Sequence, residues 1–437
     1  MYFNKLRVIL ILIFCLTVTE LFADDYRYDI DVEGYRYDVI DEGSPSFNEI
    51  EIPLLKNNKL SELIGDDRFK VKLYSGEFYV GDDNVNLTKN NKEYGSAWAN
   101  VGGGSFQFVM PEFLDISLTP QFIYIPIGND QMKNFCANID AMANLKINDI
   151  ISTGVGMGYN YSKPLRGDTN AYNAENISRY ITPYIDIKPT ERVGVRLDTS
   201  LYDLTNEPAG YNNSFKAVSF SGMPYWNYEE GGQLGLKYTQ GYKAFQDSAR
   251  GNVNWNEVMV MAKKQLTERI SGNVAIGYQS RRYDSGDNFN SVVGALGLEY
   301  KPTGKVKINL TGARTPYDSS AYSAFDISNN VVFNSQTESD MGVSNNTQRL
   351  TTNYNVANQV GLGVRYTPIV PLKLEAKISA ARIENGDPNY NLGRASVSAV
   401  YSINEYVSVG ISYIFRVQSQ SSGYTDSMIT SGIVFSF

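Results

Sequence analysis

The residues with the clearest chemical potential are nine lysines and arginines at alternate positions of predicted β-strands. Successive side chains of a strand point to opposite faces, so residues two apart share a face. In each of these segments the opposite face carries apolar residues, for example Val193, Val195 and Leu197 beside Arg196. The nine basic residues assigned to the polar face are Arg196, Lys237, Arg281, Lys307, Arg365, Lys373, Lys377, Arg394 and Arg416.

Basic side chains that line an enclosed aqueous path favour the passage of anions. The same sorting also places Lys146, Asp115, Asp140, Asp186 and Glu299 on the polar face. Lysines and arginines outnumber acids among all the residues assigned to that face. A simpler interpretation is that these charges pair across neighbouring strands, as the sequence Lys373, Glu375, Lys377 would allow. The sequence leaves both interpretations open.

The composition argues against an enzyme. The chain has no histidine, so sites that depend on histidine for proton transfer, metal binding or a catalytic triad are unavailable. The Gly102–Gly104 run has no helix after it, so it predicts close packing of a strand and not a phosphate loop. The segment Asp284–Asp287 lacks the ligand count of a calcium loop. We therefore expect neither catalysis nor a cofactor or metal.

Nucleic acid is also excluded as a partner. The formal net charge is −8, and the basic residues are dispersed along strand interiors and form no basic patch.

The elements that would position the nine basic residues form a repeating unit from Arg68 onward. An alternating segment, a short turn, a second alternating segment and a longer polar loop recur along the chain. Asn148-Asp149 and Asn404-Glu405 are typical short turns, whereas residues 163–175, 205–211 and 316–355 are the long polar connections. Short turns on one rim and long loops on the other are typical of outer-membrane barrels.

Parity of the connections predicts about 18 strands, with 16 as the alternative count. This count includes strands at Arg68–Val80 and Gly231–Ala244 and a weak strand at Tyr211–Phe220. The expected fold is therefore all-β: a transmembrane antiparallel barrel over residues 68–437, with short periplasmic turns and long extracellular loops. A large soluble β-sandwich is the alternative, but it accounts for neither the loop asymmetry nor the end of the chain.

The last strand, residues 426–437, ends the chain on an aromatic residue. Ile429, Ile433, Phe435 and Phe437 fall on one face at a two-residue period. A terminal aromatic residue after such a strand is typical of the insertion signal of outer-membrane barrels. We assign this signal to Ile433, Phe435 and Phe437, with outer-membrane lipid and the barrel assembly machinery as the expected partners.

The first 67 residues differ from the rest. Residues 1–23 have a basic start, a short apolar core and Ala23 before Asp24, which predicts a secretory signal peptide. Residues 24–67 contain 13 acidic and four basic residues, which predicts a flexible periplasmic segment. Beyond the signal peptide only Cys136 remains, so no intrachain disulfide is expected.

Four stretches resemble the β-barrel porin 2 family: residues 177–204, 234–245, 270–320 and 401–415. They share Tyr-containing strands, Pro- or Gly-marked turns and the spacing of Gly294, Gly297 and Tyr300. The resemblance covers residues 98–437. It implies an outer-membrane barrel and, since members are often linked to exopolysaccharide operons, a part in exopolysaccharide export, with an acidic polysaccharide and periplasmic export proteins as partners. It carries no catalytic residues.

Three functional hypotheses follow. The first is a porin-like channel in the outer membrane. The second is a structural or adhesive surface barrel whose lumen is filled by the loops predicted at 205–228 and 316–355. The third, a barrel hydrolase, ranks last because histidine is absent.

Overall fold

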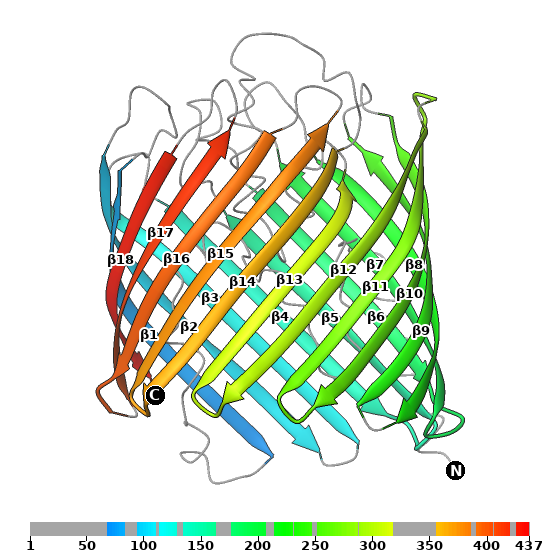
Figure 1. Cartoon of the computed structure of the whole chain (residues 1–437), viewed down its shortest axis with the longest axis horizontal. Coiled ribbons are helices and arrows are strands. Elements are labelled where there is room, and N and C mark those ends of the chain that lie inside the picture. The colour runs from blue at the N-terminus through cyan, green and yellow to red at the C-terminus, as the bar shows by residue number, and fades with distance from the viewer. Residues whose placement is uncertain are drawn as a thin grey trace.

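The protein is a single closed β-barrel of 18 antiparallel strands (Figure 1). The computed structural model describes residues 68–83, 94–110, 113–128, 134–162, 176–206, 214–229, 231–246, 251–286, 288–317, 355–385, 390–404, 406–419 and 425–436. The predicted signal peptide, the acidic segment at 24–67 and Phe437 lie outside these residues. Among the described residues, no helix is long and apolar enough to cross a membrane.

The first nine strands are β1 (Phe69–Asp82), β2 (Gly95–Met110), β3 (Leu114–Gly128), β4 (Asn134–Lys146), β5 (Ile151–Ser162), β6 (Asn176–Ile187), β7 (Val193–Asn206), β8 (Phe215–Glu229) and β9 (Gly232–Phe245). The second nine are β10 (Val253–Thr267), β11 (Ile270–Tyr283), β12 (Asn288–Thr303), β13 (Val306–Tyr317), β14 (Asn355–Ile369), β15 (Leu372–Asn385), β16 (Tyr390–Ser402), β17 (Val407–Ser419) and β18 (Thr425–Ser436).

Each strand pairs with the strands before and after it, and β1 pairs with β18 to close the sheet, with Glu77 opposite Ile433. Closure leaves no unpaired edge, which a structure surrounded by lipid requires. The predicted count of 18 strands is confirmed, and the β-sandwich alternative is wrong because one closed sheet replaces two packed ones.

The connections differ in length between the two ends of the barrel. The strand bounds leave two to five residues between strands at one end, and four to 37 residues at the other, where the longest connection is 318–354. The short turns mark the periplasmic rim and the long connections the outer rim.

Strand β8 corrects the prediction of a loop at 205–228 and of a weak strand at Tyr211–Phe220. The strand begins at Phe215 and runs to Glu229, so most of the predicted loop is barrel wall. Its sequence contains Gly222 and Pro224, which normally interrupt strands. In the pairing of β8 with β9, Met223 and Pro224 have no opposite residue, whereas the pairing of β8 with β7 continues through both. The wall thus accommodates a residue that cannot donate a backbone hydrogen bond.

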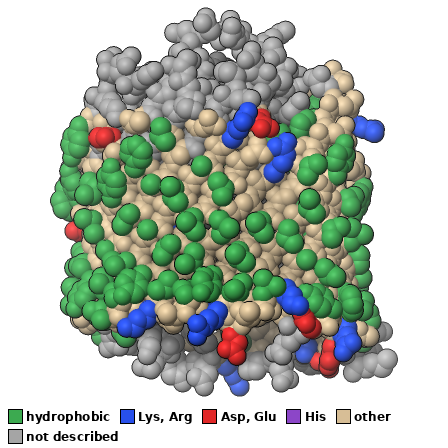
Figure 2. Space-filling view, viewed as in Figure 1, with side chains coloured by type: hydrophobic (Ala, Val, Ile, Leu, Met, Phe, Trp, Pro, Cys, Tyr) green, Lys and Arg blue, Asp and Glu red, His purple; other side chains and the backbone are tan. Residues whose placement is uncertain are grey.

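The outer face of the wall is apolar. Alternate residues such as Ile276, Val360 and Ile378 are exposed, whereas the residues between them are more buried and face inward. Figure 2 shows hydrophobic side chains spread over the wall between the two rims, with almost all charged side chains near the rims. This apolar belt is the surface that lipid tails cover, and it places the barrel in the outer membrane.

Glu77 interrupts the apolar belt at the seam where the barrel closes. It shares the outward face of β1 with Leu73 and lies opposite Ile433 on β18 and Asn100 on β2. A carboxylate on the lipid-facing side costs free energy, although less than a lysine or arginine at the same depth. We expect Glu77→Leu to raise the free energy of unfolding by about 1 kcal/mol.

Equilibrium unfolding in urea, read by the heat-modifiable mobility of the barrel, measures this change. Glu268→Leu is the matched control, because Glu268 lies in the short turn between β10 and β11 and outside the belt. An equal increase in the free energy of unfolding in both variants would show that the position of Glu77 in the belt is irrelevant.

Candidate functional site

The candidate site is the lumen-facing wall of the barrel. Strand alternation places eight of the nine predicted basic residues inward, for example Lys373 and Lys377 between the outward positions of β15. Six lie in the periplasmic half: Arg196, Lys237, Lys307, Arg365, Lys373 and Lys377. Arg281 and Arg394 lie near the outer rim. Arg416 lies on β17, but its side chain is outside the described part of the structure.

A row of charged side chains, here called the charged ladder, crosses β12 to β15 near the periplasmic rim. It consists of Glu299, Lys301, Lys307, Arg365, Lys373, Glu375 and Lys377. Glu299 on β12 forms ion pairs with Lys307 and, at 2.7 Å, with Lys301. In the adjoining row, Lys307 lies directly opposite Arg365. Arg365 pairs with Glu375 at 3.1 Å. Two cations therefore stand side by side in the middle of this ladder.

The remaining members of the ladder add positive charge. Lys373 and Lys377 flank Glu375 on the inward face of β15. Lys307 and Arg365 are 35% and 41% exposed, so their charges are accessible from the lumen. The predicted cross-strand pairing is therefore present, but it leaves more cations than acids on this wall.

The wall formed by β3 to β7 has the opposite balance. Asp140 accepts a hydrogen bond from Tyr180 at 2.6 Å, and Asp186 accepts one from Tyr225 at 2.9 Å. Arg196 pairs with Asp198 at 2.8 Å on the same strand. These hydrogen bonds hold the carboxylates in fixed positions on the wall.

Glycines make the two tyrosine contacts possible. The ring of Tyr180 crosses Gly158 on the intervening strand, and the ring of Tyr225 crosses Gly194. A Cβ on Gly158 would lie 2.2 Å from the Tyr180 ring, and one on Gly194 would lie 2.3 Å from the Tyr225 ring. Glycine is therefore required where a ring lies flat against the inner wall. The predicted close packing at Gly102–Gly104 is also present, with Tyr74 over Gly103 on the inner face and Phe122 over Gly102 on the outer face.

Lys146, at the periplasmic end of β4, pairs with Asp149 in the following turn at 2.8 Å. The hydrogen bond and the charge of Lys146 lower the pKa of the exposed Asp149 carboxyl below its usual value.

The two walls face each other across the lumen. Strands β5 and β14 are nine positions apart in an 18-stranded closed sheet, so they are diametrically opposed. The inward charges of β3 to β7 are Asp115, Asp140, Asp186, Asp198, Lys146 and Arg196. Those of β12 to β15 are Glu299, Glu375, Lys301, Lys307, Arg365, Lys373 and Lys377. Four acids and two cations therefore oppose two acids and five cations, which sets up an electric field across the lumen.

The basic residues near the outer rim have a different environment. Arg281 is 2% exposed. Its guanidinium donates hydrogen bonds to the Gln279 side chain at 2.6 Å and to the carbonyl oxygen of Pro316 at 2.9 Å. Gln279 in turn donates to Glu257 at 2.8 Å. Arg394 is 3% exposed. Arg281 therefore belongs to a buried polar network, and both arginines are less accessible than the charged residues at the periplasmic rim.

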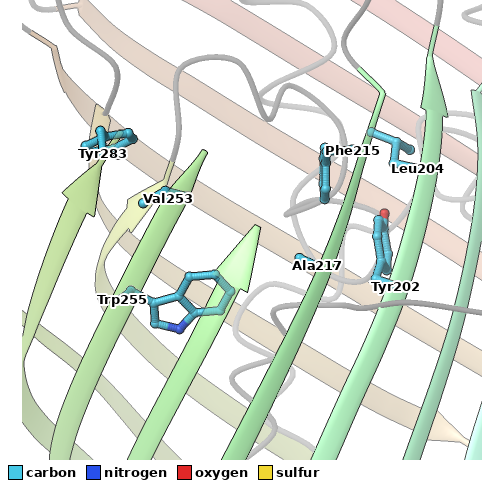
Figure 3. Close-up of a cluster of buried hydrophobic side chains, with 7 residues drawn as sticks. All are labelled: Tyr202, Leu204, Phe215, Ala217, Val253, Trp255 and Tyr283. Carbon is cyan, nitrogen blue, oxygen red and sulfur yellow. The ribbon is translucent and has the colours of Figure 1, made fainter. Parts of the chain in front are cut away.

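Apolar side chains also face the lumen, and the alternation of the sequence does not mark most of them as inward. Figure 3 shows the outer aromatic cluster, which consists of Tyr202, Leu204, Phe215, Ala217, Val253, Trp255 and Tyr283. Tyr202 and Phe215 stack at 5.6 Å. A second cluster contains Met223, Tyr225, Met259, Met261, Ala275 and Val293. The inner wall from β7 to β12 therefore contains two buried apolar clusters among its polar residues.

The signal for these clusters is weak in the sequence because β10 is apolar on both faces. Val253, Trp255 and Met259 point inward, while Val258 and Val260 point outward. Alternation assigns a face only when the two faces differ in polarity. Glu257, the one acid on this strand, is the signal that marks its inner face.

Among the described residues, no group of three or more acidic or cysteine side chains is arranged to hold a metal ion.

No family model matches the chain, and no curated protein matches it. The β-barrel porin 2 family is therefore not among the matches. Among solved structures, the barrel is similar to the outer membrane protein OpdK of Pseudomonas aeruginosa (11% identity, TM-score 0.48, covering 84% of this chain and 99% of that chain). It is also similar to OccK9 (OpdG) of P. aeruginosa (8%, 0.48, 84% and 98%) and to OccAB4 of Acinetobacter baumannii (9%, 0.46, 85% and 99%). These similarities are too distant to assign a function to the chain.

Proposed function

We propose that this outer-membrane barrel is a channel for small anionic solutes. The observation that carries the proposal is the excess of accessible cations on β12 to β15, where Lys307 and Arg365 are adjacent and partly exposed. Placing two cations side by side contributes little to folding, because like charges repel. Such an arrangement becomes favourable when an anion occupies the space in front of it.

The opposing acidic wall would orient a solute as it passes. An anionic group is attracted to the ladder on β12 to β15 and repelled by Asp115, Asp140 and Asp198 on the far wall. Uncharged parts of the solute would then lie against the acidic side, where Tyr180 and Ser221 already engage the carboxylates. Because only one wall attracts the anionic group, the solute should bind weakly enough to leave the channel again.

An acidic polysaccharide is the more specific solute that the sequence resemblance implies. Its repeated carboxylates would engage the ladder in turn, and the export role is a narrower form of the same proposal. The charges of the described residues favour anions as a class.

A closed surface barrel is the second candidate, and burial of the inner wall favours it. Leu204, Val253 and Val293 face inward, yet their side chains are 0% exposed. A wide aqueous pore would leave such residues accessible. Of the loops predicted to fill the lumen, residues 215–229 belong to the wall, and residues 318–354 lie outside the described part of the chain.

Solute uptake into proteoliposomes distinguishes the two candidates. Glucuronate should enter several-fold faster than glucose, which has nearly the same size, because the ladder attracts the carboxylate. Raising the salt to about 1 M should reduce this preference, since the screening length falls to about 3 Å. Liposomes that contain heat-denatured protein are the control. Equal rates for both sugars would contradict anion preference, and no uptake of either would favour the closed barrel.

A further inference from the structure

Charged side chains on the lipid-facing side of the barrel gather in two clusters near the outer rim. The first, here called the Arg314 cluster, comprises Arg314 on β13, Asn358 on β14, and Arg382 and Glu384 on β15. They share the outward face with the exposed residues Val360, Leu362 and Ile378. Each lies within four residues of the outer end of its strand. The cluster is therefore at the upper edge of the apolar belt, where lipid headgroups begin.

The Arg314 cluster places two guanidinium groups around one carboxylate. Arg314 lies opposite Asn358, and Asn358 lies opposite Arg382, so the arginines are two strands apart, or about 10 Å between backbones. Glu384 lies 3.5 Å from Arg314 and 3.7 Å from Arg382. Arg314 also donates to the Asn358 side chain and to the carbonyl oxygen of Val292.

A second cluster, here called the Arg179 cluster, repeats this arrangement with other residues. Arg179 on β6 lies opposite Asp203 on β7, and Asp203 lies opposite Lys216 on β8. The Arg179 guanidinium is 3.6 Å from the Asp203 carboxylate. All three share the outward face with Ile185, Leu197 and Phe220, and all lie close to the outer ends of their strands. Again two cations, two strands apart, surround one acid.

Structural ion pairing alone accounts poorly for the two clusters. Each cluster has a net charge of +1, so one cation exceeds what the single carboxylate neutralises. Arg382 is 59% exposed and Arg314 is 39% exposed, and ion pairs at such exposure contribute little to stability. Two independent sets of residues nevertheless produce the same spacing at the same rim.

The position of the two clusters limits which class of ligand could bind there. A group that binds there must approach from the membrane, beside Val360 and Leu362 in one cluster and Leu197 and Phe220 in the other. It must also carry negative charge that accepts hydrogen bonds from guanidinium or ammonium groups. A phosphate group on a lipid of the outer leaflet satisfies both requirements, because arginine binds phosphate in a fixed geometry while the acyl chains cover the apolar wall below.

We propose that the Arg314 and Arg179 clusters are two binding sites for phosphorylated lipid of the outer leaflet. In Figure 1, β13 to β15 lie on the near side of the barrel and β6 and β7 on the far side. Two lipids would therefore be held on opposite sides of the wall. Figure 2 shows basic side chains beside acidic ones at the upper edge of the hydrophobic band, as such sites require. The proposal is independent of whether the lumen conducts.

Native mass spectrometry of the detergent-purified barrel tests the two sites, with bisphosphorylated lipid A as the probe. We expect retention of up to two lipids by the wild type. Arg314→Gln with Arg382→Gln, and separately Arg179→Gln with Lys216→Gln, should each remove one of them, and the combined variant should lower lipid affinity at least tenfold. Heat-modifiable mobility establishes that every variant is folded.

The matched control is Arg269→Gln with Lys305→Gln. These cations also lie two strands apart, but at the periplasmic rim, where they donate to the carbonyl oxygens of Pro302 and Pro368. An equal loss of lipid in this control would overturn the proposal. So would equal retention of dephosphorylated lipid A by the wild type. Binding of inorganic phosphate without retention of lipid A would overturn the assignment to lipid.

Discussion

Replacing Arg365, Lys373 and Lys377 with glutamine should shift the reversal potential of the channel from the anion side to the cation side. The change removes three of the five inward cations of β12 to β15 and leaves Lys301, Lys307, Glu299 and Glu375 in place. The β12 to β15 wall would then carry no net charge, opposite a wall that stays acidic. Charge that lines a narrow path acts with little screening, so the selectivity should change more than the protein's net charge suggests.

Glu375→Gln is the matched control, because it removes the acid that pairs with Arg365 and leaves the cations. It should strengthen anion preference, opposite to the triple variant. If the ladder only stabilises the wall, the triple variant would lower the unfolding temperature and leave the reversal potential where it is in the wild type. That outcome would contradict a role of the ladder in selectivity.

Trp255→Ala combined with Phe215→Ala should raise the single-channel conductance several-fold. Both side chains belong to the outer aromatic cluster, both are almost fully buried, and both point into the lumen. The indole ring of Trp255 lies against Gly241, where a Cβ would come within 1.9 Å of the ring. Removing the two rings takes apolar bulk out of the lumen near the outer rim, which should widen the path there. The same change should destabilise the barrel by about 3 kcal/mol or more, as large-to-small changes in a packed cluster do.

Trp226→Ala provides the comparison for this variant. Trp226 is on the outward face of β8, so its removal alters the lipid contact and leaves the lumen unchanged. The single-channel conductance of the Trp226→Ala variant should equal that of the wild type. An unchanged conductance in the double variant would show that the path does not pass the outer aromatic cluster.

Most of the fold could be predicted from the sequence because the strands alternate strongly. In β7 and β17, Val and Leu on one side and Ser, Gly or Arg on the other determine which face meets lipid. The parity of the short turns then required an even number of strands. The position of β8 could not be predicted, because Gly222 and Pro224 resemble a turn until the neighbouring ladders are known.

Less of the site could be predicted. Alternation placed Lys307 and Arg365 on the inner face, but their adjacency depends on the register between β13 and β14. Residues 318–354 separate these strands, and a long connection does not fix the register as a tight turn does. The burial of Arg281 likewise depends on Gln279 and on Pro316, which is 35 residues away in sequence. Sequence patterns give the face of a residue and not its cross-strand partners.

Planar-bilayer recording of the purified wild-type barrel under an approximately tenfold KCl gradient tests the central claim most directly. A channel whose β12 to β15 wall carries excess accessible cations should show discrete current steps and a reversal potential on the anion side. An ohmic current that reverses at zero potential would contradict the role of the charged wall. The absence of current, from protein whose heat-modifiable mobility shows it to be folded, would contradict the channel and favour the closed surface barrel.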